Sequence, residues 1–196
     1  MSCGGNSESP QPINSDDFDR SDILANAYDN IIMPAYNKFN SDLLYLDEKT
    51  NIFINNINTE NLNNLRSSWA KAYKSWQAIE MFNLRKAEEI NFARIANSYP
   101  CIEEIILNNI NDSVSEIISF TSSMLGATGL PAFGYMIYGN DSSIIQTIFS
   151  GNDGLKYSAY LNALVKNLVV HTNSVIADWS ISRSEFINST SNTPTS

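Results

Sequence analysis

The chain has 196 residues, of which 43% are hydrophobic and 17% charged, and its formal net charge is -9. This balance is typical of a globular domain with a core rather than of a disordered chain. The acidic charge argues against a nucleic-acid-binding surface, because such surfaces depend on clustered Lys and Arg. No apolar run approaches the roughly 20 residues that a membrane-spanning helix needs.

Residues 1–18 are predicted to form a flexible tether, because they contain Gly, Ser, Pro and Asp and almost no apolar side chain. The stretch Ser2-Cys3-Gly4-Gly5 resembles the start of a bacterial lipoprotein after removal of its signal peptide, with the lipid on Cys3. The alternative is an ordinary cysteine in a mobile N-terminus, and no structural disulfide with Cys101 is expected. We therefore expect an exported cell-envelope lipoprotein that meets the membrane only through Cys3.

Residues 21–57 are predicted to form one long helix or two nearly collinear ones, because apolar side chains recur at steps of three and four residues. The expected buried stripe comprises Ile23, Ala27, Ile31, Ala35, Phe39, Leu43, Leu46, Phe53 and Ile57. Pro34 removes a backbone donor inside this pattern, so a kink is expected around residues 30–34.

The next helix is predicted to begin with Thr59 as its N-cap. Its expected buried stripe comprises Leu62, Leu65, Trp69, Tyr73, Trp76 and Glu80, with both tryptophans in the core. The carboxylate of Glu80 is unusual on a face whose other side chains are apolar or aromatic. It should pair with Arg85 or Arg94, cap a helix or bind a cation, and a plain structural ion pair is the alternative to a functional site.

The rest of the chain is also predicted to be helical. Two short helices should be split near Ser98-Tyr99-Pro100, and further helices should span Ser113 to Leu125, Pro131 to Gly139 and Asp141 to about Phe149. The expected stripe of a long last helix comprises Leu161, Leu164, Val165, Leu168, Thr172, Val175, Ile176 and Trp179. The sequence therefore predicts an all-α, up-down bundle of about four main helices with short accessory helices over residues 19–187, followed by a polar tail at 188–196.

Few residues carry obvious chemistry. His171 is the single histidine, which excludes an HExxH pair or a histidine-based metal cluster, and we interpret it as a packing or surface residue. The glycine-rich stretch from Gly126 to Gly129 resembles a phosphate cradle only weakly, because no strand precedes it and no P-loop lysine follows.

Four sequence blocks together resemble the imelysin-like family, in particular its Bacteroidetes-type lipoprotein branch. The blocks are Ile31-Ile32-Met33-Pro34-Ala35-Tyr36, Trp69 with Trp76-Gln77-Ala78-Ile79-Glu80, Asn97-Ser98-Tyr99-Pro100, and the eleven residues from Gly129 to Gly139. The resemblance implies a fold of two helical bundles related by duplication, in exported proteins associated with iron uptake and once described as peptidases. This chain resembles the N-terminal half and ends in a polar segment where family members usually continue, so we expect either a missing second bundle after residue 196 or a shortened relative of the family.

The family's motif is Gly-x-His-x-x-Glu, in which two metal ligands share one helix face. Gly129 matches its glycine, but Pro131 and Gly134 stand where the motif has its histidine and glutamate. Neither residue has a side chain that can bind metal, so we expect no metal site, no catalytic residue and no cofactor, with iron or zinc implied only by the family. The remaining candidates for ligand binding are Glu80, Tyr99 and Gly129.

Three hypotheses about function remain. The preferred one is a non-catalytic cell-envelope lipoprotein domain that binds a small ligand or an envelope protein, with a link to iron acquisition that the family resemblance implies. The second is an imelysin-type metallopeptidase, which the degenerate motif disfavours. The third is a purely structural surface domain, which should have no deep pocket near Glu80.

Overall fold

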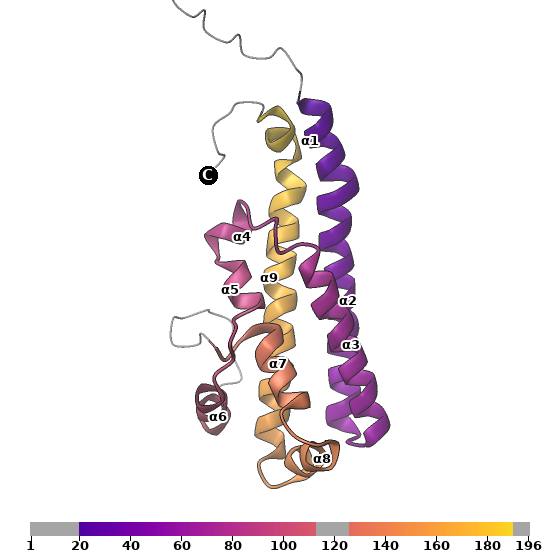
Figure 1. Ribbon diagram of the computed structural model, residues 1–196, viewed down its shortest axis with the longest axis vertical. Helices are drawn as coiled ribbons and strands as arrows, with labels where there is room; N and C mark the ends of the chain where they lie inside the picture. The colour runs from indigo at the N-terminus through magenta and orange to yellow at the C-terminus, as the bar shows by residue number, and fades with distance from the viewer. Residues whose placement is uncertain (1–19, 113–125, 190–196) are drawn as a thin grey trace, which may run out of the picture.

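A computed structural model describes residues 20–112 and 126–189, and within these ranges it contains helices and no strand (Figure 1). The elements are α1 (Ser21–Ala27), a π-helical turn η1 (Tyr28–Ile32), α2 (Met33–Asn55), α3 (Thr59–Gln77), α4 (Lys86–Glu89), α5 (Phe92–Ala96), α6 (Glu103–Asn111), α7 (Gly129–Tyr138), α8 (Ser142–Ser150) and α9 (Gly154–Asn188). The predicted all-α class is confirmed. The helix expected from Ser113 to Leu125, the tether and most of the polar tail lie outside the described residues.

The four main helices contact one another in a ring, in which α2 packs on α3, α3 on α7, α7 on α9 and α9 on α2. With 35 residues, α9 is about 50 Å long and runs beside α2 and α1 in Figure 1. The shorter helices α4 and α5 pack on α9, and α8 contacts α3, α7 and α9 near the opposite end. Within the described residues, no helix is long and apolar enough to cross a membrane.

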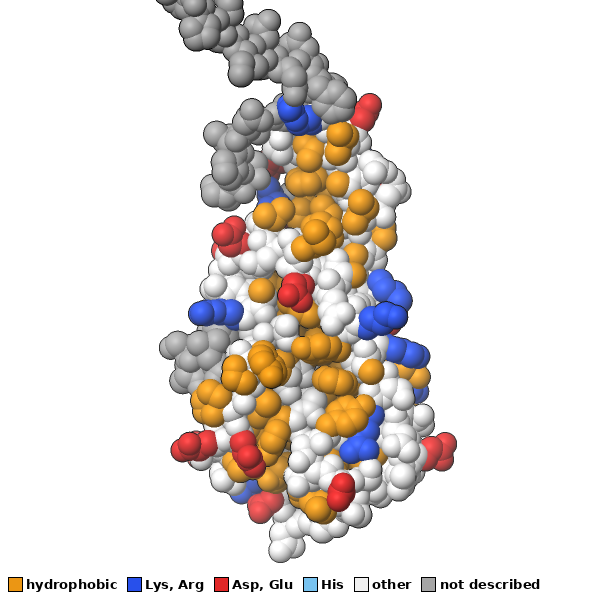
Figure 2. Space-filling model, in the orientation of Figure 1, with side chains coloured by type: hydrophobic (Ala, Val, Ile, Leu, Met, Phe, Trp, Pro, Cys, Tyr) orange, Lys and Arg blue, Asp and Glu red, His pale blue; other side chains and the backbone are white. Residues whose placement is uncertain are grey.

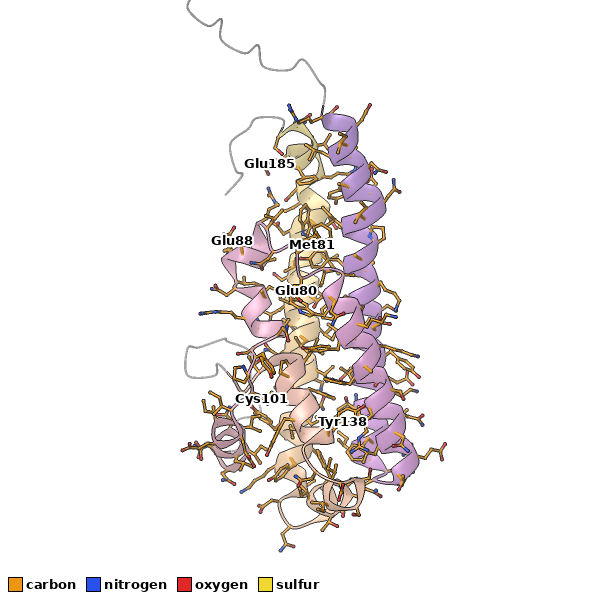
Figure 3. The ribbon with its side chains drawn as sticks, in the orientation of Figure 1. Glu80, Met81, Glu88, Cys101, Tyr138 and Glu185 are labelled. Carbon is orange, nitrogen blue, oxygen red and sulfur yellow. The ribbon has the colours of Figure 1, made fainter. Side chains whose placement is uncertain are left out.

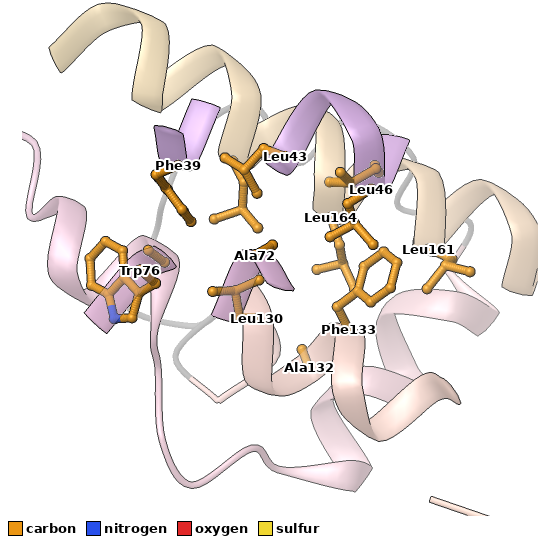
Figure 4. Packing of buried hydrophobic residues seen from close by; sticks show 14 of the residues in the cluster. Phe39, Leu43, Leu46, Ala72, Trp76, Leu130, Ala132, Phe133, Leu161 and Leu164 are labelled. Carbon is orange, nitrogen blue, oxygen red and sulfur yellow. The ribbon is translucent and has the colours of Figure 1, made fainter. Parts of the chain in front are cut away.

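The core lies along the axis of this ring, where apolar side chains of all four helices meet (Figure 4). Its members include Phe39, Leu43 and Leu46 of α2, Ala72 and Trp76 of α3, Leu130, Ala132 and Phe133 of α7, and Leu161 and Leu164 of α9. The stripe predicted for α9 is confirmed, with only Ile176 partly exposed. Apolar spacing alone was sufficient there, because α9 is continuous and keeps one phase.

The kink expected at Pro34 takes the form of η1. The wider π-helical turn lies directly before Pro34, at the place where an α-helix would bring the proline ring against the carbonyl four residues earlier. This turn shifts the phase of the helix, so the buried residues before Phe39 are Tyr28, Ile32 and Tyr36. The stripe predicted through Ile23 and Ile31 was therefore wrong in this part, and Ile31 is 50% exposed.

The start of α3 also differs from the prediction by one residue. Asn58 is the N-cap, and its side-chain oxygen accepts a hydrogen bond from the backbone N–H of Asn61 at 2.9 Å. Thr59 is the first helical residue. Both residue types favour caps, so the sequence could locate the boundary but not choose between adjacent positions.

The start of α7 depends on Gly129, which has a φ of 75°. A Cβ atom here would lie 2.4 Å from the carbonyl oxygen of Ala96. Only glycine tolerates both the left-handed backbone and this approach of α7 to α5. The helix thus begins two residues before the predicted start at Pro131 and ends at Tyr138, with the predicted last residue Gly139 as its C-cap, whose N–H donates to the carbonyl of Tyr135 at 2.8 Å.

Candidate functional site: an aromatic groove between α3 and α7

A groove of about 470 Å³ opens between α3, α7 and the segment that precedes α6, and we call it the aromatic groove. It is lined by Trp69, Tyr73, Tyr99, Cys101, Pro131, Gly134, Tyr135, Tyr138 and Gly139. Figure 2 shows hydrophobic side chains gathered on this face over α7, and Figure 3 places Cys101 and Tyr138 on the same side of the molecule. Its volume lies within the range of small-molecule sites.

The α3 wall of the groove is formed by two aromatic rings. Trp69 and Tyr73 are one helical turn apart and stack with their ring centroids 5.2 Å apart. Trp69 Nε1 donates a hydrogen bond to the carbonyl of Leu130 at 2.8 Å, and the Tyr73 hydroxyl donates to Asn97 Oδ1 at 3.1 Å. Both rings are half-buried, and these bonds fix their orientation.

The α7 wall combines a glycine with further aromatic residues. Gly134 lets the Trp69 indole lie against the backbone of α7, because a Cβ atom at this position would be 2.7 Å from Trp69 Cζ2. Tyr138 packs on Trp69 with a centroid separation of 5.3 Å. The Arg66 guanidinium lies 4.8 Å from the centre of the Tyr138 ring, and its Nε donates to the carbonyl of Ile137 at 2.7 Å. The exposed Tyr138 ring is therefore held between an indole and a cation.

The third wall is the segment before α6, which two hydrogen bonds with Gly126 hold beside the segment that leads into α7. The N–H of Gly126 donates to Ser98 Oγ at 2.9 Å, and the N–H of Ile102 donates to the carbonyl of Gly126 at 2.6 Å. Tyr99, which precedes a cis peptide bond to Pro100, is 81% exposed at the rim. The face of this ring is therefore accessible from solvent at the edge of the groove.

Tyr135 provides the groove with a neutral hydroxyl. Burial, followed by a hydrogen bond with Glu103 and the charge of that carboxylate, raises the pKa of Tyr135 above its ordinary value. The phenol therefore stays protonated to a higher pH than an ordinary tyrosine does. It supplies a polar group to a groove that is otherwise mainly apolar.

The comparisons with known proteins agree on one family. The family model described as "Peptidase_M75: Imelysin" matches residues 32–196. The chain belongs to the imelysin family. No curated protein sequence matches it. The predicted family resemblance is thereby confirmed.

The fold also resembles that of an imelysin-like protein from Psychrobacter arcticum 273-4, known from a crystal structure, with a TM-score of 0.67 and 16% sequence identity. The match covers 89% of this chain and 54% of that protein. The chain therefore spans about half the length of this imelysin-like protein, and at this identity the likeness concerns the fold.

The imelysin motif positions lie in the aromatic groove, but they do not fit a metal. Pro131 and Gly134 both line it, and neither offers a side-chain donor. The space next to Gly134, where a glutamate would project, is filled by the Trp69 indole. Among the residues that the structure describes, no group of three or more His, Cys, Asp or Glu side chains is placed to hold a metal ion.

Glu80 lies outside the aromatic groove, and its predicted burial was wrong. Helix α3 ends at Gln77, so the next residues turn away, Ile79 takes the buried position and Glu80 is exposed (Figure 3). Arg85, one of its expected partners, instead forms ion pairs with Asp178 at 3.2 Å and Glu185 at 3.1 Å. The Glu80 carboxylate is therefore solvated and does not need a buried partner.

The other residues singled out from the sequence lie in different parts of the molecule. Tyr99 lies at the rim of the aromatic groove, while Gly129 is buried and shapes the start of α7 without lining the groove. His171 is partly buried, and its Nδ1 lies 2.8 Å from the carbonyl oxygen of Asn167 one turn earlier, as suits a packing residue. Cys3 lies outside the described residues.

Sequence reasoning missed most of the groove. It assigned Trp69 and Tyr73 to the core and did not select Cys101, Tyr135 or Tyr138. The spacing of aromatic residues signals a helix face, but a face at the edge of the core has the same spacing as one at its centre. The unusual composition of α7, with three aromatic residues around Gly134, was the available signal.

Proposed function

We propose that this chain is a non-catalytic binding domain of the imelysin family and that the aromatic groove is its binding site. The observation that carries the proposal is the groove itself, because it includes motif positions 131 and 134 but has aromatic rings where a metal-binding site would need donors. An apolar or aromatic face of a small ligand, or an aromatic side chain of a partner protein, suits such a surface.

The groove is prepared for binding before any ligand arrives. Trp69 and Tyr73 are fixed by hydrogen bonds, and Tyr138 is held by Trp69 and Arg66. Rings that are already ordered lose little conformational entropy when a ligand stacks on them. This preorganisation favours a binding role over a purely structural one.

The cellular setting is part of the same proposal. The Ser2-Cys3-Gly4-Gly5 start supports a lipid on Cys3 and a place in the cell envelope, with residues 4–18 as the linker. The link to iron acquisition is supported only by the family resemblance. Mass spectrometry of the native protein should find Cys3 acylated, whereas an unmodified thiol would contradict the lipoprotein assignment.

Binding to the groove can be tested with the neutral aromatic dye N-phenyl-1-naphthylamine, whose fluorescence rises in apolar surroundings. The test variants are Tyr99→Ala and Tyr138→Ala, because both rings are exposed groove residues. Each should weaken dye affinity about two- to tenfold, as expected for the loss of one aromatic contact. Tyr45→Ala on α2 is the matched control and should leave the affinity unchanged. Equal dye affinity in all four proteins, or no binding by the parent chain, would contradict the proposal.

A further inference from the structure

A second groove, of about 370 Å³, lies on the other flank of α3, and we call it the lysine groove. It is lined by Ala35, Lys38 and Asp42 from α2, Lys71, Lys74 and Ser75 from α3, and Ala78 just beyond α3. Figure 2 shows Lys and Arg side chains gathered at the right edge of the view, over α2 and α3. A concave basic site is unexpected on a chain with a net charge of -9.

The charges in the lysine groove do not balance. Asp42, which is only 8% exposed, is its one carboxylate and is paired with Lys38 on the preceding turn of α2. Lys71 lies 5.2 Å from the centre of the Tyr45 ring, and within the described part of the chain neither Lys71 nor Lys74 forms an ion pair.

Lys71 and Lys74 therefore leave the groove with uncompensated positive charge. Three residues apart on α3, they lie on one helix face, where like charges repel. An anion between them would remove this repulsion. The Lys38–Asp42 pair forms the opposite wall and holds Lys38 within the same groove.

The side-chain types favour phosphate over carboxylate. Lysine binds phosphate as a point charge, and the charge of about -2 that a phosphomonoester carries at neutral pH matches two uncompensated ammonium groups better than the single charge of a carboxylate does. Ala35, Ala78 and the lysine stems give the groove an apolar floor. The groove thus offers charge at its rim and apolar contact below.

We propose that the lysine groove is a binding site for a phosphate group attached to an apolar body, held by Lys71 and Lys74 with Lys38 on the facing wall. A phospholipid headgroup and a soluble phosphomonoester share this chemistry. The site is independent of the aromatic groove, because no residue lines both. A single phosphate also differs from a nucleic-acid backbone, which needs an extended basic surface.

Two binding measurements on the full chain test this site and separate the two sources. One is calorimetric titration with phenyl phosphate, and the other is sedimentation with phosphatidylcholine vesicles that contain phosphatidylglycerol. Each is repeated with the double variant Lys71→Gln, Lys74→Gln and with the control Lys86→Gln, Lys166→Gln, which removes the same number of positive charges away from the groove. Both variants are first checked for native helicity by circular dichroism.

The parent chain should bind at least one probe, and added salt should weaken the binding. The groove variant should lose about tenfold or more in affinity, since hydrogen bonds to charged groups are among the stronger ones, while the control should keep its affinity. Binding of phenyl phosphate would assign a soluble ligand, and binding of vesicles alone would assign a lipid headgroup. No binding of either probe, or equal losses in both variants, would overturn the proposal.

Discussion

The two tryptophans of α3 show how one helix face can serve two purposes. Trp69 and Trp76 are seven residues apart and therefore point in nearly the same direction. Trp76 is 2% exposed and packs with Phe39 and Phe92 at centroid separations of 5.7 and 5.4 Å. We call this cluster of three rings the closed end of α3. Trp69 is half-buried beside Gly134 and lines the aromatic groove. The facing element, not the periodicity of α3, decides which tryptophan becomes core and which remains available for binding.

The largest effect should separate the two tryptophans directly. Trp76→Ala leaves a cavity between aromatic rings and should lower the free energy of unfolding by about 3 to 5 kcal/mol. Trp69→Ala removes a partly exposed ring and one hydrogen bond, so we expect a smaller loss of about 1 to 3 kcal/mol together with loss of dye binding. Urea unfolding measures both values. Equal destabilisation would show that Trp69 is as much a core residue as Trp76.

The free energy of unfolding should also depend on pH through Tyr36, which lies on α2 three residues before Phe39. The Tyr36 hydroxyl donates to the carbonyl of Phe82 at 2.9 Å, and burial raises the pKa of Tyr36 from 10.0 to about 12. The folded state thus favours the neutral phenol. This contribution to stability is fully present below pH 10 and is lost as the pH rises toward 12.

The measurement is unfolding by urea at pH 9 and at pH 12. Over this range the parent chain should lose about 2 kcal/mol more stability than Tyr36→Phe, which cannot ionise at this position. The other tyrosines are present in both proteins and cancel in the difference. Parallel losses in the two proteins would mean that Tyr36 is not effectively desolvated.

A smaller effect is expected at Gly134, where the backbone of α7 closely approaches the Trp69 ring. Gly134→Ala brings a Cβ atom to 2.7 Å from Trp69 Cζ2, and overpacking of this kind costs about 1 to 3 kcal/mol. Replacing glycine inside a helix returns about 1 kcal/mol, so the net loss should be at most about 2 kcal/mol. Adding Trp69→Phe should relieve the clash. Strictly additive effects in this double-mutant cycle would contradict the proposed contact.

The sequence was sufficient to predict the buried face of a helix where the helical spacing of apolar residues continues without interruption. The stripe of α9 and the second half of α2 were predicted correctly, because repeated apolar spacing outweighs any single residue. The prediction failed where local geometry changes that phase. The π-helical turn before Pro34 moved the buried position from Ile31 to Ile32, and the end of α3 at Gln77 moved it from Glu80 to Ile79.

The candidate site was predictable only in part for a related reason. The family motif located Pro131 and Gly134, which do line the aromatic groove, and the separate resemblance block from Asn97 to Pro100 contains Tyr99, which lies at the rim. The rings of Trp69 and Tyr73 were assigned to the core, because spacing along α3 says nothing about the size of the side chains on α7. Gly134 creates the room for Trp69, and that relation exists only once two helices are packed together.

The central claim is the proposal that this groove binds aromatic groups and not metal, and calorimetric titration of chelator-treated protein with Zn²⁺ and with Fe²⁺ tests it most directly. Pro131 and Gly134 offer no ligands, and Cys101 and Glu103 alone are too few for a closed tetrahedral site. We predict no stoichiometric binding at micromolar metal concentrations. One-to-one micromolar binding that disappears in Cys101→Ser or Glu103→Gln would contradict the account and favour the metallopeptidase or iron-carrier hypothesis.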